Sequence, residues 1–130
     1  MANNITTPQT SSGVCGVEID MIQVNLNKAH AAQVELLNKI KQLESYIVLV
    51  TEPYCFKKKL VLTPKSSNVL PINRKDHPRA AIYSSSNIKL TEITELAHRD
   101  LAIGVTKLEG KKVALVSLYL DIKESPNRNS

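Results

Sequence analysis

The order of apolar and polar residues predicts a strand, a helix and a second strand in the first half of the chain. From Ile19 the string IDMIQVNL alternates roughly between apolar and polar residues, which is typical of a strand. Residues 28–45 follow with one apolar stripe at helical spacing, and Asn27 is the expected N-cap of a helix of about five turns. The run YIVLV from Tyr46 has the composition of a strand buried on both faces. The stripe consists of Ala29, Ala32, Leu36, Leu37, Ile40 and Leu43.

Two strands joined by a helix within this length form a right-handed βαβ unit, so we expect the two strands to be parallel. Further along, KKLVLTP and RAAIYSS are candidate strands, and three prolines interrupt the segment between them. The strings LAIGVTKL and KVALVSLYLDI are expected to form a hairpin in which Gly110 supplies the turn. The pattern predicts the α/β (α+β) class, with a mixed sheet and a flanking helix.

The polar stretches at the two ends set the expected domain boundaries. Residues 1–17 are rich in Asn, Thr, Ser, Pro and Gly, and residues 123–130 are polar, so we expect a disordered leader and a disordered tail. Residues 18–122 would form the folded domain. The start lacks the pattern of a secretory signal, and no stretch approaches the roughly 20 apolar residues of a membrane span, so we expect a soluble, intracellular protein.

Charge is the compositional feature that changes this picture. The formal net charge is +5, and the segment of residues 57–79 accounts for this excess. It contains seven basic residues, and Asp76 is its only acidic residue. Contact with nucleic-acid phosphates is one interpretation, and a solvated loop is the other. An aromatic content of 4% disfavours a base-stacking platform, so any contact is expected to be mostly with phosphate. The basic residues are Lys57, Lys58, Lys59, Lys65, Arg74, Lys75 and Arg79.

The search for catalytic motifs leaves a small set of oxygen ligands. The sequence has no glycine-rich phosphate loop, no HExxH, no GxSxG and no Cys/His set at metal spacing. Asn25 and Asn27 stand at the end of the first strand, and Glu52 stands at the end of the second. If the strands are adjacent and parallel, these side chains emerge at one edge and form half of a magnesium site. The alternative is a helix cap and a partly exposed glutamate.

Several strings, taken in order, resemble a known superfamily. IQVNLNKAHAAQVELL, YIVLVTEPY, RAAIY and VALVSLYLDI are similar to segments of the endonuclease/exonuclease/phosphatase superfamily, which includes deoxyribonuclease I. The resemblance is strongest to the N-terminal endonuclease domain of non-LTR retrotransposon polyproteins, and it covers roughly residues 22–122. It implies half of a four-layer αββα sandwich built from two mixed sheets. We expect that this half leaves the inner face of one sheet without its partner sheet.

The resemblance also implies roles for individual residues. Glu52 matches the metal-binding glutamate, and Asn25 matches an asparagine that helps to hold the metal and the phosphate. Asn27 falls where relatives often carry an acidic residue that supports or binds the metal. Tyr119 matches a tyrosine that hydrogen-bonds the scissile phosphate, although a strand tyrosine with its hydroxyl in water is the plainer interpretation. The implied cofactor is Mg²⁺ or Mn²⁺.

The sequence departs from the family in the residues that complete catalysis. The DxN motif and the SDH motif of the superfamily are absent, so we expect a gene fragment that is at best a poor nuclease. The first hypothesis is a magnesium-dependent endonuclease domain that nicks DNA, from which a reverse transcriptase region would prime, and its place would be the nucleus. The second is a non-catalytic remnant that binds nucleic acid. A relative acting on RNA or phosphoinositides shares the same motifs.

Overall fold

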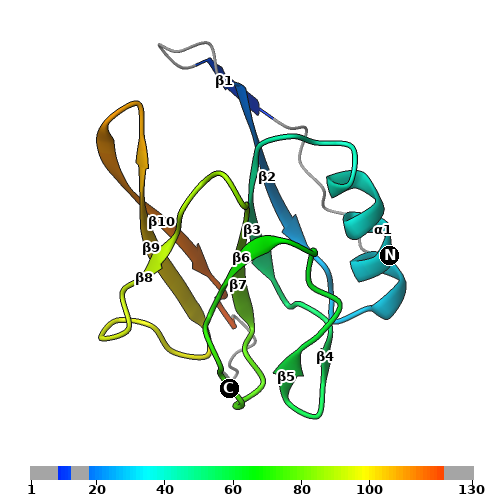
Figure 1. Cartoon of the computed structure of the whole chain (residues 1–130). Helices are drawn as coiled ribbons and strands as arrows, with labels where there is room; N and C mark the ends of the chain where they lie inside the picture. The colour runs from blue at the N-terminus through cyan, green and yellow to red at the C-terminus, as the bar shows by residue number, and fades with distance from the viewer. Residues whose placement is uncertain (1–8, 13–17, 122–130) are drawn as a thin grey trace, which may run out of the picture.

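The computed structural model describes residues 9–12 and 18–121, and strands dominate these residues (Figure 1). In chain order the elements are β1 (Gln9–Ser12), β2 (Glu18–Asn25), α1 (His30–Ile40), β3 (Tyr46–Thr51), β4 (Cys55–Phe56), β5 (Lys59–Leu60), β6 (Ser67–Leu70), β7 (Ala80–Ser85), β8 (Thr91–Glu92), β9 (Leu101–Leu108) and β10 (Lys111–Leu118).

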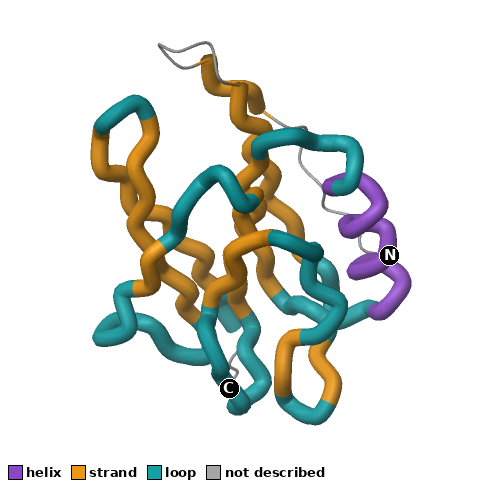
Figure 2. The backbone as a smooth tube through the Cα atoms, in the orientation of Figure 1, coloured by secondary structure: helices purple, strands orange, loops and turns teal. Residues whose placement is uncertain are grey.

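The central sheet has five strands in the order β1-β2-β3-β7-β6. Strands β2 and β3 are parallel and joined through α1, as the βαβ pattern predicts, and every other pairing in this sheet is antiparallel. The prediction of a mixed sheet with a flanking helix is therefore confirmed (Figure 2).

A second sheet contains the predicted hairpin. Its order is β10-β9-β8, and β9 and β10 pair along their whole length, from Lys111 opposite Leu108 to Leu118 opposite Leu101. Glu109 and Gly110 form the turn, both with positive φ, which is the conformation of the tight turns that join antiparallel strands. The short β4–β5 hairpin forms a separate two-stranded sheet.

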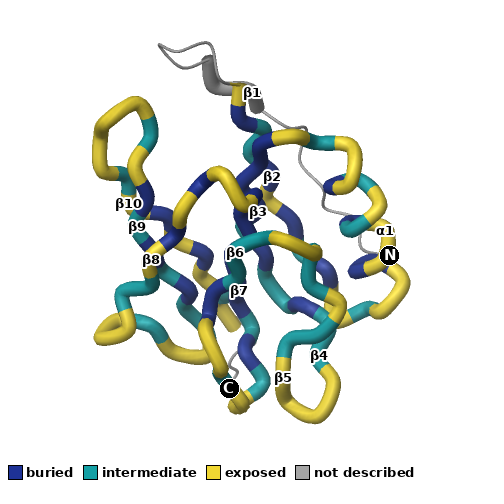
Figure 3. The backbone as a smooth tube through the Cα atoms, viewed as in Figure 1, coloured by how far each residue is buried: buried dark blue, intermediate teal, exposed yellow. Residues whose placement is uncertain are grey.

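The elements pack in three layers: α1, the central sheet and the three-stranded sheet (Figures 1 and 3). Strand β3 shows why the central sheet is covered on both faces: its apolar residues point alternately into two cores. Tyr46, Val48 and Val50 belong to the cluster that α1 covers, whereas Ile47 and Leu49 belong to the cluster between the sheets. The strand is thus buried on both faces, as its composition predicted.

The two sheets approach closely at Gly104 in β9. A Cβ atom at this position would lie 2.5 Å from Leu70 Cδ1 and 3.1 Å from the carbonyl oxygen of Thr91. Glycine therefore allows β9 to lie directly over the edge of the central sheet.

The helix is shorter than predicted, and its expected cap is wrong. It begins at His30 with Ala29 at the N-cap position, and no side chain caps it. Asn27 and Lys28 instead adopt left-handed conformations, with φ of 52° and 58°, and form a turn before the helix. The cause is tertiary, because the backbone N–H of Lys28 donates to the carbonyl oxygen of Glu52 at 2.8 Å and holds the turn against the end of β3.

Strand β1 lies in the segment for which a disordered leader was expected. Residues 9–12 pair antiparallel with β2, so the expectation does not hold for these four residues. Backbone hydrogen bonds form along an open strand edge whatever the side chains, which explains why a polar sequence pairs there. The rest of the expected leader, and the expected tail at residues 123–130, lie outside the described residues.

The uncovered apolar surface differs from the expected one. The β9–β10 hairpin itself covers the inner face of the central sheet, so the expectation of a bare inner face is wrong. Two exposed apolar residues of β10 lie together on the outer face of the three-stranded sheet, where Val116 and Leu118 are 44% and 49% exposed. Within residues 9–12 and 18–121, no helix is long and apolar enough to cross a membrane.

Candidate active site

The carboxyl ends of β2 and β3 bring two of the predicted site residues to one edge of the central sheet. Asn25 is the last residue of β2 and pairs with Thr51, the last residue of β3. Glu52 follows immediately. The side-chain oxygen Oδ1 of Asn25 accepts the backbone N–H of Asn27 at 2.8 Å, and an amide oxygen with two lone pairs keeps one for another partner.

The backbone of Glu52 is held from both sides. Its N–H donates to the carbonyl oxygen of Arg79 at 2.9 Å, and its carbonyl oxygen accepts the N–H of Lys28. Its φ of 51° is left-handed, a conformation that costs about 1–2 kcal/mol for a residue with a Cβ. Such conformations persist where the surroundings fix them, and they cluster at functional sites. Pro53 is buried and follows directly, so the strand stops at the acid.

Tyr119 reaches the same edge from the second sheet. Its N–H donates to the carbonyl oxygen of Asp100 at 2.9 Å. Two residues earlier, the hydroxyl of the buried Ser117 donates to the carbonyl oxygen of Val50 at 2.7 Å, and this bond fastens the end of β10 to β3. The serine therefore sets where the tyrosine lies relative to the end of β3.

The phenol of Tyr119 is close to the carboxylate of Glu52. Burial raises the pKa of Tyr119, and so do the negative charges of Glu52 and Asp121 and a hydrogen bond with Glu52, whereas Arg79 lowers it. The phenol is thus protonated and able to donate a hydrogen bond at neutral pH. Two predicted residues from distant parts of the chain meet here, and Asn25 lies on the neighbouring strand.

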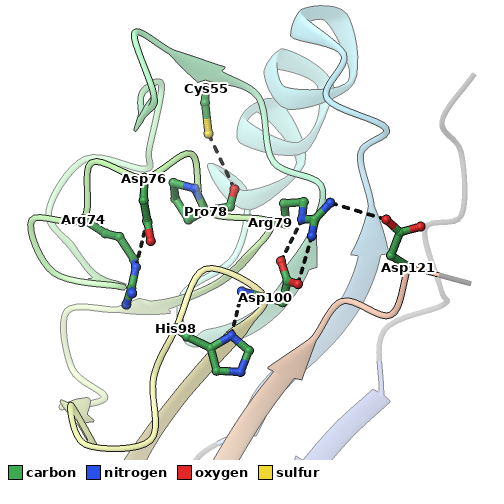
Figure 4. A network of polar contacts seen from close by, with 8 residues as sticks. All are labelled: Cys55, Arg74, Asp76, Pro78, Arg79, His98, Asp100 and Asp121. Carbon is green, nitrogen blue, oxygen red and sulfur yellow. Dashed lines mark hydrogen bonds and ion pairs between the residues drawn. The ribbon is translucent and has the colours of Figure 1, made fainter.

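Arg79 and Asp100 form a charged pair beside this site that the sequence did not indicate as a pair (Figure 4). Arg79 donates to both carboxylate oxygens of Asp100, from Nε at 2.7 Å and from a terminal nitrogen at 2.9 Å. Its other terminal nitrogen lies 3.7 Å from a carboxylate oxygen of Asp121, and its guanidinium lies 4.8 Å from the centre of the Tyr119 ring. The hydrogen bond from Arg79 lowers the pKa of Asp100.

In the sequence, this pair could have been found from the position of each residue directly before a strand. Arg79 directly precedes β7 and Asp100 directly precedes β9, so each stands where a strand begins. Because β7 runs antiparallel to β3, its start lies beside the end of β3, where Glu52 is. The backbone N–H of Arg79 also donates to the carbonyl oxygen of Arg99 at 2.6 Å, which joins the two strand starts.

The remaining basic residues predicted to contact nucleic acid are spread over several segments. Lys57 and Lys58 form the exposed turn of the β4–β5 hairpin, and Arg74 is paired with Asp76 at 2.8 Å. Contact with nucleic acid stays a prediction for all of them. The other exposed members are Lys59, Lys65 and Lys75.

A basic cluster lies around His77, and two of its members escaped the sequence reasoning. Burial lowers the pKa of His77 first, and the positive charges of four basic residues lower it further. Lys28 and Arg99 lie outside the basic segment of the sequence and join it only in the fold. We define the basic cluster as Lys28, Lys58, Arg79 and Arg99.

The donor set suits a hard cation only in part. Within the described residues there is no group of three or more His, Cys, Asp or Glu side chains that could hold a metal. The carboxylate of Glu52 and the amide oxygen of Asn25 are the donors that the sheet edge offers. Magnesium sites commonly use one or two carboxylates and complete their shell with phosphate and water, so this pair fits a substrate-assisted magnesium site.

Within the described residues, no histidine is hydrogen-bonded to Glu52 or Tyr119. His30 packs edge-on against Tyr54, with ring centres 5.0 Å apart. His98 accepts the backbone N–H of Asp100 through Nδ1 at 3.2 Å. His77 lies among the basic cluster.

A hollow of about 830 Å³ lies away from this site. The end of α1 and residues 62–66 line it, with Leu37, Leu43 and Leu62 among its apolar residues. Of the predicted site residues, only Lys65 lines it. The candidate chemistry therefore sits at an open sheet edge and not in this hollow.

Comparison with solved structures identifies a similar fold. The endonuclease domain of TRAS1, a telomere-specific non-LTR retrotransposon, superposes with a TM-score of 0.64 at 20% sequence identity. The match covers 80% of this chain and 45% of that chain, so the chain spans less than half of the known domain. No protein-family model matches the sequence, and no curated protein matches it. The fold that the sequence resemblance implied is thus confirmed.

Proposed function

We propose that this chain carries the metal- and phosphate-binding part of an endonuclease site and hydrolyses phosphodiester bonds in DNA, nicking one strand slowly. The observation that supports this most is the meeting of Glu52 and Tyr119 beside Asn25 at the carboxyl edge of β2 and β3. Ligand sites of open α/β sheets lie at this edge. Glu52 and Asn25 would hold Mg²⁺ or Mn²⁺, which when bound supplies a Lewis acid for a phosphate oxygen.

The chain's own residues would bind and orient the scissile phosphate. The protonated phenol of Tyr119 donates a hydrogen bond to a phosphate oxygen, where negative charge develops during hydrolysis. Arg79 keeps its ion pair with Asp100 and holds the Tyr119 ring in place from 4.8 Å. Asn27 supports the turn that carries Lys28 to the carbonyl of Glu52.

The expected rate is low because, among the described residues, no histidine is hydrogen-bonded to Glu52 or Tyr119 where a general base would act. The three histidines contact other groups, and the DxN and SDH motifs are absent from the sequence. General acid–base catalysis commonly contributes about 100- to 10,000-fold to a rate. We therefore expect slow nicking and no efficient cleavage.

DNA is the proposed substrate because the basic cluster lies beside the candidate site. Arg79 is already paired with Asp100, so Lys28, Lys58 and Arg99 offer the contacts to the phosphate backbone. Lys28 and Arg79 meet the backbone of Glu52 on this side of the edge. In a retroelement the nick would leave a 3′ end from which a reverse transcriptase region could prime, and the protein would act in the nucleus.

The test is a nicking assay on supercoiled plasmid with Mg²⁺. The chain should produce open circles, and Glu52→Gln, which keeps the shape of the side chain, should reduce the rate by about 100-fold or more through the lost metal ligand. Glu35→Gln, on the exposed face of α1, is the matched control and should nick normally. Nicking that survives Glu52→Gln would overturn the assignment of the metal site. Activity on RNA or a phosphoinositide in place of DNA would reassign the substrate.

The basic cluster, considered without the metal site, favours a second function: binding of nucleic acid without catalysis. It predicts no open circles, with binding that weakens steeply as salt rises. Lys28→Ala with Arg99→Ala would then weaken binding, whereas Glu52→Gln would not. Nicking by the unaltered chain excludes this function as the sole one.

A further inference from the structure

The β4–β5 hairpin exposes an aromatic side chain close to the candidate site. Phe56 is the only phenylalanine in the sequence, and 56% of it is exposed. Its neighbours in the hairpin explain why the Phe56 side chain points outward. Leu60 packs against the core under α1, and Cys55 donates through Sγ to the carbonyl oxygen of Pro78 at 3.7 Å. Since side chains alternate along a strand, Phe56 and its partner Lys59 point the other way.

The turn of this hairpin holds two lysines in an unfavourable conformation. Lys57 and Lys58 have φ of 53° and 66°, the left-handed geometry that normally selects Asn-Gly. Two positive charges are therefore kept at the tip despite a backbone cost. The Lys57 ammonium lies 5.5 Å from the centre of the Phe56 ring, so charge and aromatic surface form one unit.

The hairpin is held to the body of the protein at its tip and just before its first strand. The backbone N–H of His77 donates to the carbonyl oxygen of Lys58 at 2.9 Å. Before the hairpin, the N–H of Tyr54 donates to the side-chain oxygen of the buried Gln33 at 3.2 Å. A tip that is already fixed loses little conformational entropy when it binds a partner. Figure 1 places the hairpin beside the ends of β2 and β3.

The distance to the candidate site is short. Phe56 follows Glu52 by four residues, so their Cα atoms are at most about 14 Å apart. At about 3.4 Å per nucleotide along a strand, this spans roughly four nucleotides. The hairpin tip thus lies within reach of bases next to a phosphate bound at Glu52.

We propose that Phe56 stacks on a nucleic-acid base near the scissile phosphate, while Lys57, Lys58 and Lys59 contact the flanking phosphates. The proposal rests on the proposed function and adds a base contact to a surface otherwise expected to touch phosphate. A ring bordered by cations suits a partner that offers flat apolar faces beside regularly spaced anions. The hairpin carries no acidic residue. Lys58 belongs both to the hairpin tip and to the basic cluster, so the two positive surfaces are continuous.

The test uses the whole chain and a fluorescein-labelled DNA duplex in buffer with EDTA, which prevents cleavage. Phe56→Ala should weaken binding about tenfold through the lost stacking. Leu96→Ala is the matched control, because Leu96 is 55% exposed on the loop between β8 and β9, and this variant should bind normally.

Tryptophan variants report the contact directly, because the chain has no tryptophan. Phe56→Trp should restore binding, and its fluorescence should be quenched when DNA is added. Leu96→Trp should show no quenching. Unaltered binding by Phe56→Ala, or an unquenched Phe56→Trp, overturns the proposal while leaving the proposed function in place.

Two further outcomes separate the possible failures. If polyglutamate displaces DNA at equal charge concentration, the tip recognises acidic chains in general, and the base contact is overturned. If the unaltered chain binds no DNA, the proposed function fails together with this proposal. Loss of binding on Phe56→Ala with quenching of Phe56→Trp supports both.

Discussion

At the scale of single residues, the candidate site depends on charges that neutralise one another. Arg79 is shared between Asp100, which it binds with two hydrogen bonds, and Asp121, and it also faces the Tyr119 ring. Removal of either partner of the main pair leaves a partly buried charge uncompensated. The Arg79–Asp100 pair therefore supports both the stability of the edge and the position of Tyr119.

The stability that Asp100 contributes should depend on pH. The hydrogen bond from Arg79 lowers the pKa of Asp100 below its ordinary value of 3.8, so the contribution is complete above that value and is lost as pH falls through the lowered pKa. We expect Asp100→Asn to reduce the free energy of unfolding by about 1–2 kcal/mol at pH 7 and by clearly less near pH 2.5. Urea denaturation at the two pH values measures both differences.

The exposed pair offers the control for this prediction. Asp76 accepts from Arg74 at 2.8 Å at a more exposed position, so Asp76→Asn should change the free energy of unfolding by no more than about 0.5 kcal/mol. An equal loss for Asp100→Asn at both pH values would show that the lost hydrogen-bond acceptor matters and the lost charge does not.

At the scale of elements, one buried amide joins α1 to the segment that follows Glu52. Gln33 is fully buried on the helix, and its side-chain nitrogen donates to the hydroxyl of Tyr83 at 2.9 Å and to the carbonyl oxygen of Leu62 at 3.2 Å. Its oxygen accepts the N–H of Tyr54. Burial raises the pKa of Tyr83 to about 12, so its hydroxyl remains a neutral partner. The amide thereby joins the helix, β7 and the start of the β4–β5 hairpin.

Gln33→Ala should lower the free energy of unfolding by about 2–4 kcal/mol, because it opens a cavity and leaves buried polar groups without partners. Chemical denaturation measures the loss. Gln42→Ala, at an exposed position after the helix, should change stability by less than about 0.5 kcal/mol. A small loss for Gln33→Ala would mean that water replaces the amide and that the helix does not anchor the hairpin.

At the scale of the whole molecule, the described layers leave one apolar face open. The outer face of the three-stranded sheet carries Val116 and Leu118 side by side with the partly exposed Ile103 and Val105 of β9, and β10 is an edge strand. A contiguous apolar face next to an unpaired strand edge promotes association between molecules. The chain should therefore self-associate as its concentration rises.

Replacement of Val116 and Leu118 by threonine should reduce this association while the fold is kept, because threonine favours strands and both side chains point outward. Sedimentation velocity at rising protein concentration measures it. The control is Ile72→Thr with Leu96→Thr, which removes exposed apolar residues that stand on separate loops and should leave association unchanged. Equal association of both double variants would place the contact elsewhere.

The sequence by itself determined the parts of this protein that depend on local periodicity. The alternation in β2, the stripe of α1, the apolar run of β3 and the turn at Gly110 each predict an element, and the βαβ order predicts the parallel pair that brings Asn25 beside Glu52. These features repeat within a few residues, so the order of side chains is enough to reveal them.

Tertiary structure decided what depends on residues far apart in the chain. No periodic signal marks β6 and β8, which exist through pairing with β7 and β9. The Arg79–Asp100 pair, the burial of Gln33 and the entry of Lys28 and Arg99 into the basic cluster arise from packing. Asn27 lies in a turn and does not cap α1, because the hydrogen bond from Lys28 to Glu52 across the sheet edge outweighs the local preference. Local propensity is worth a few tenths of a kcal/mol per residue, and tertiary contacts override it.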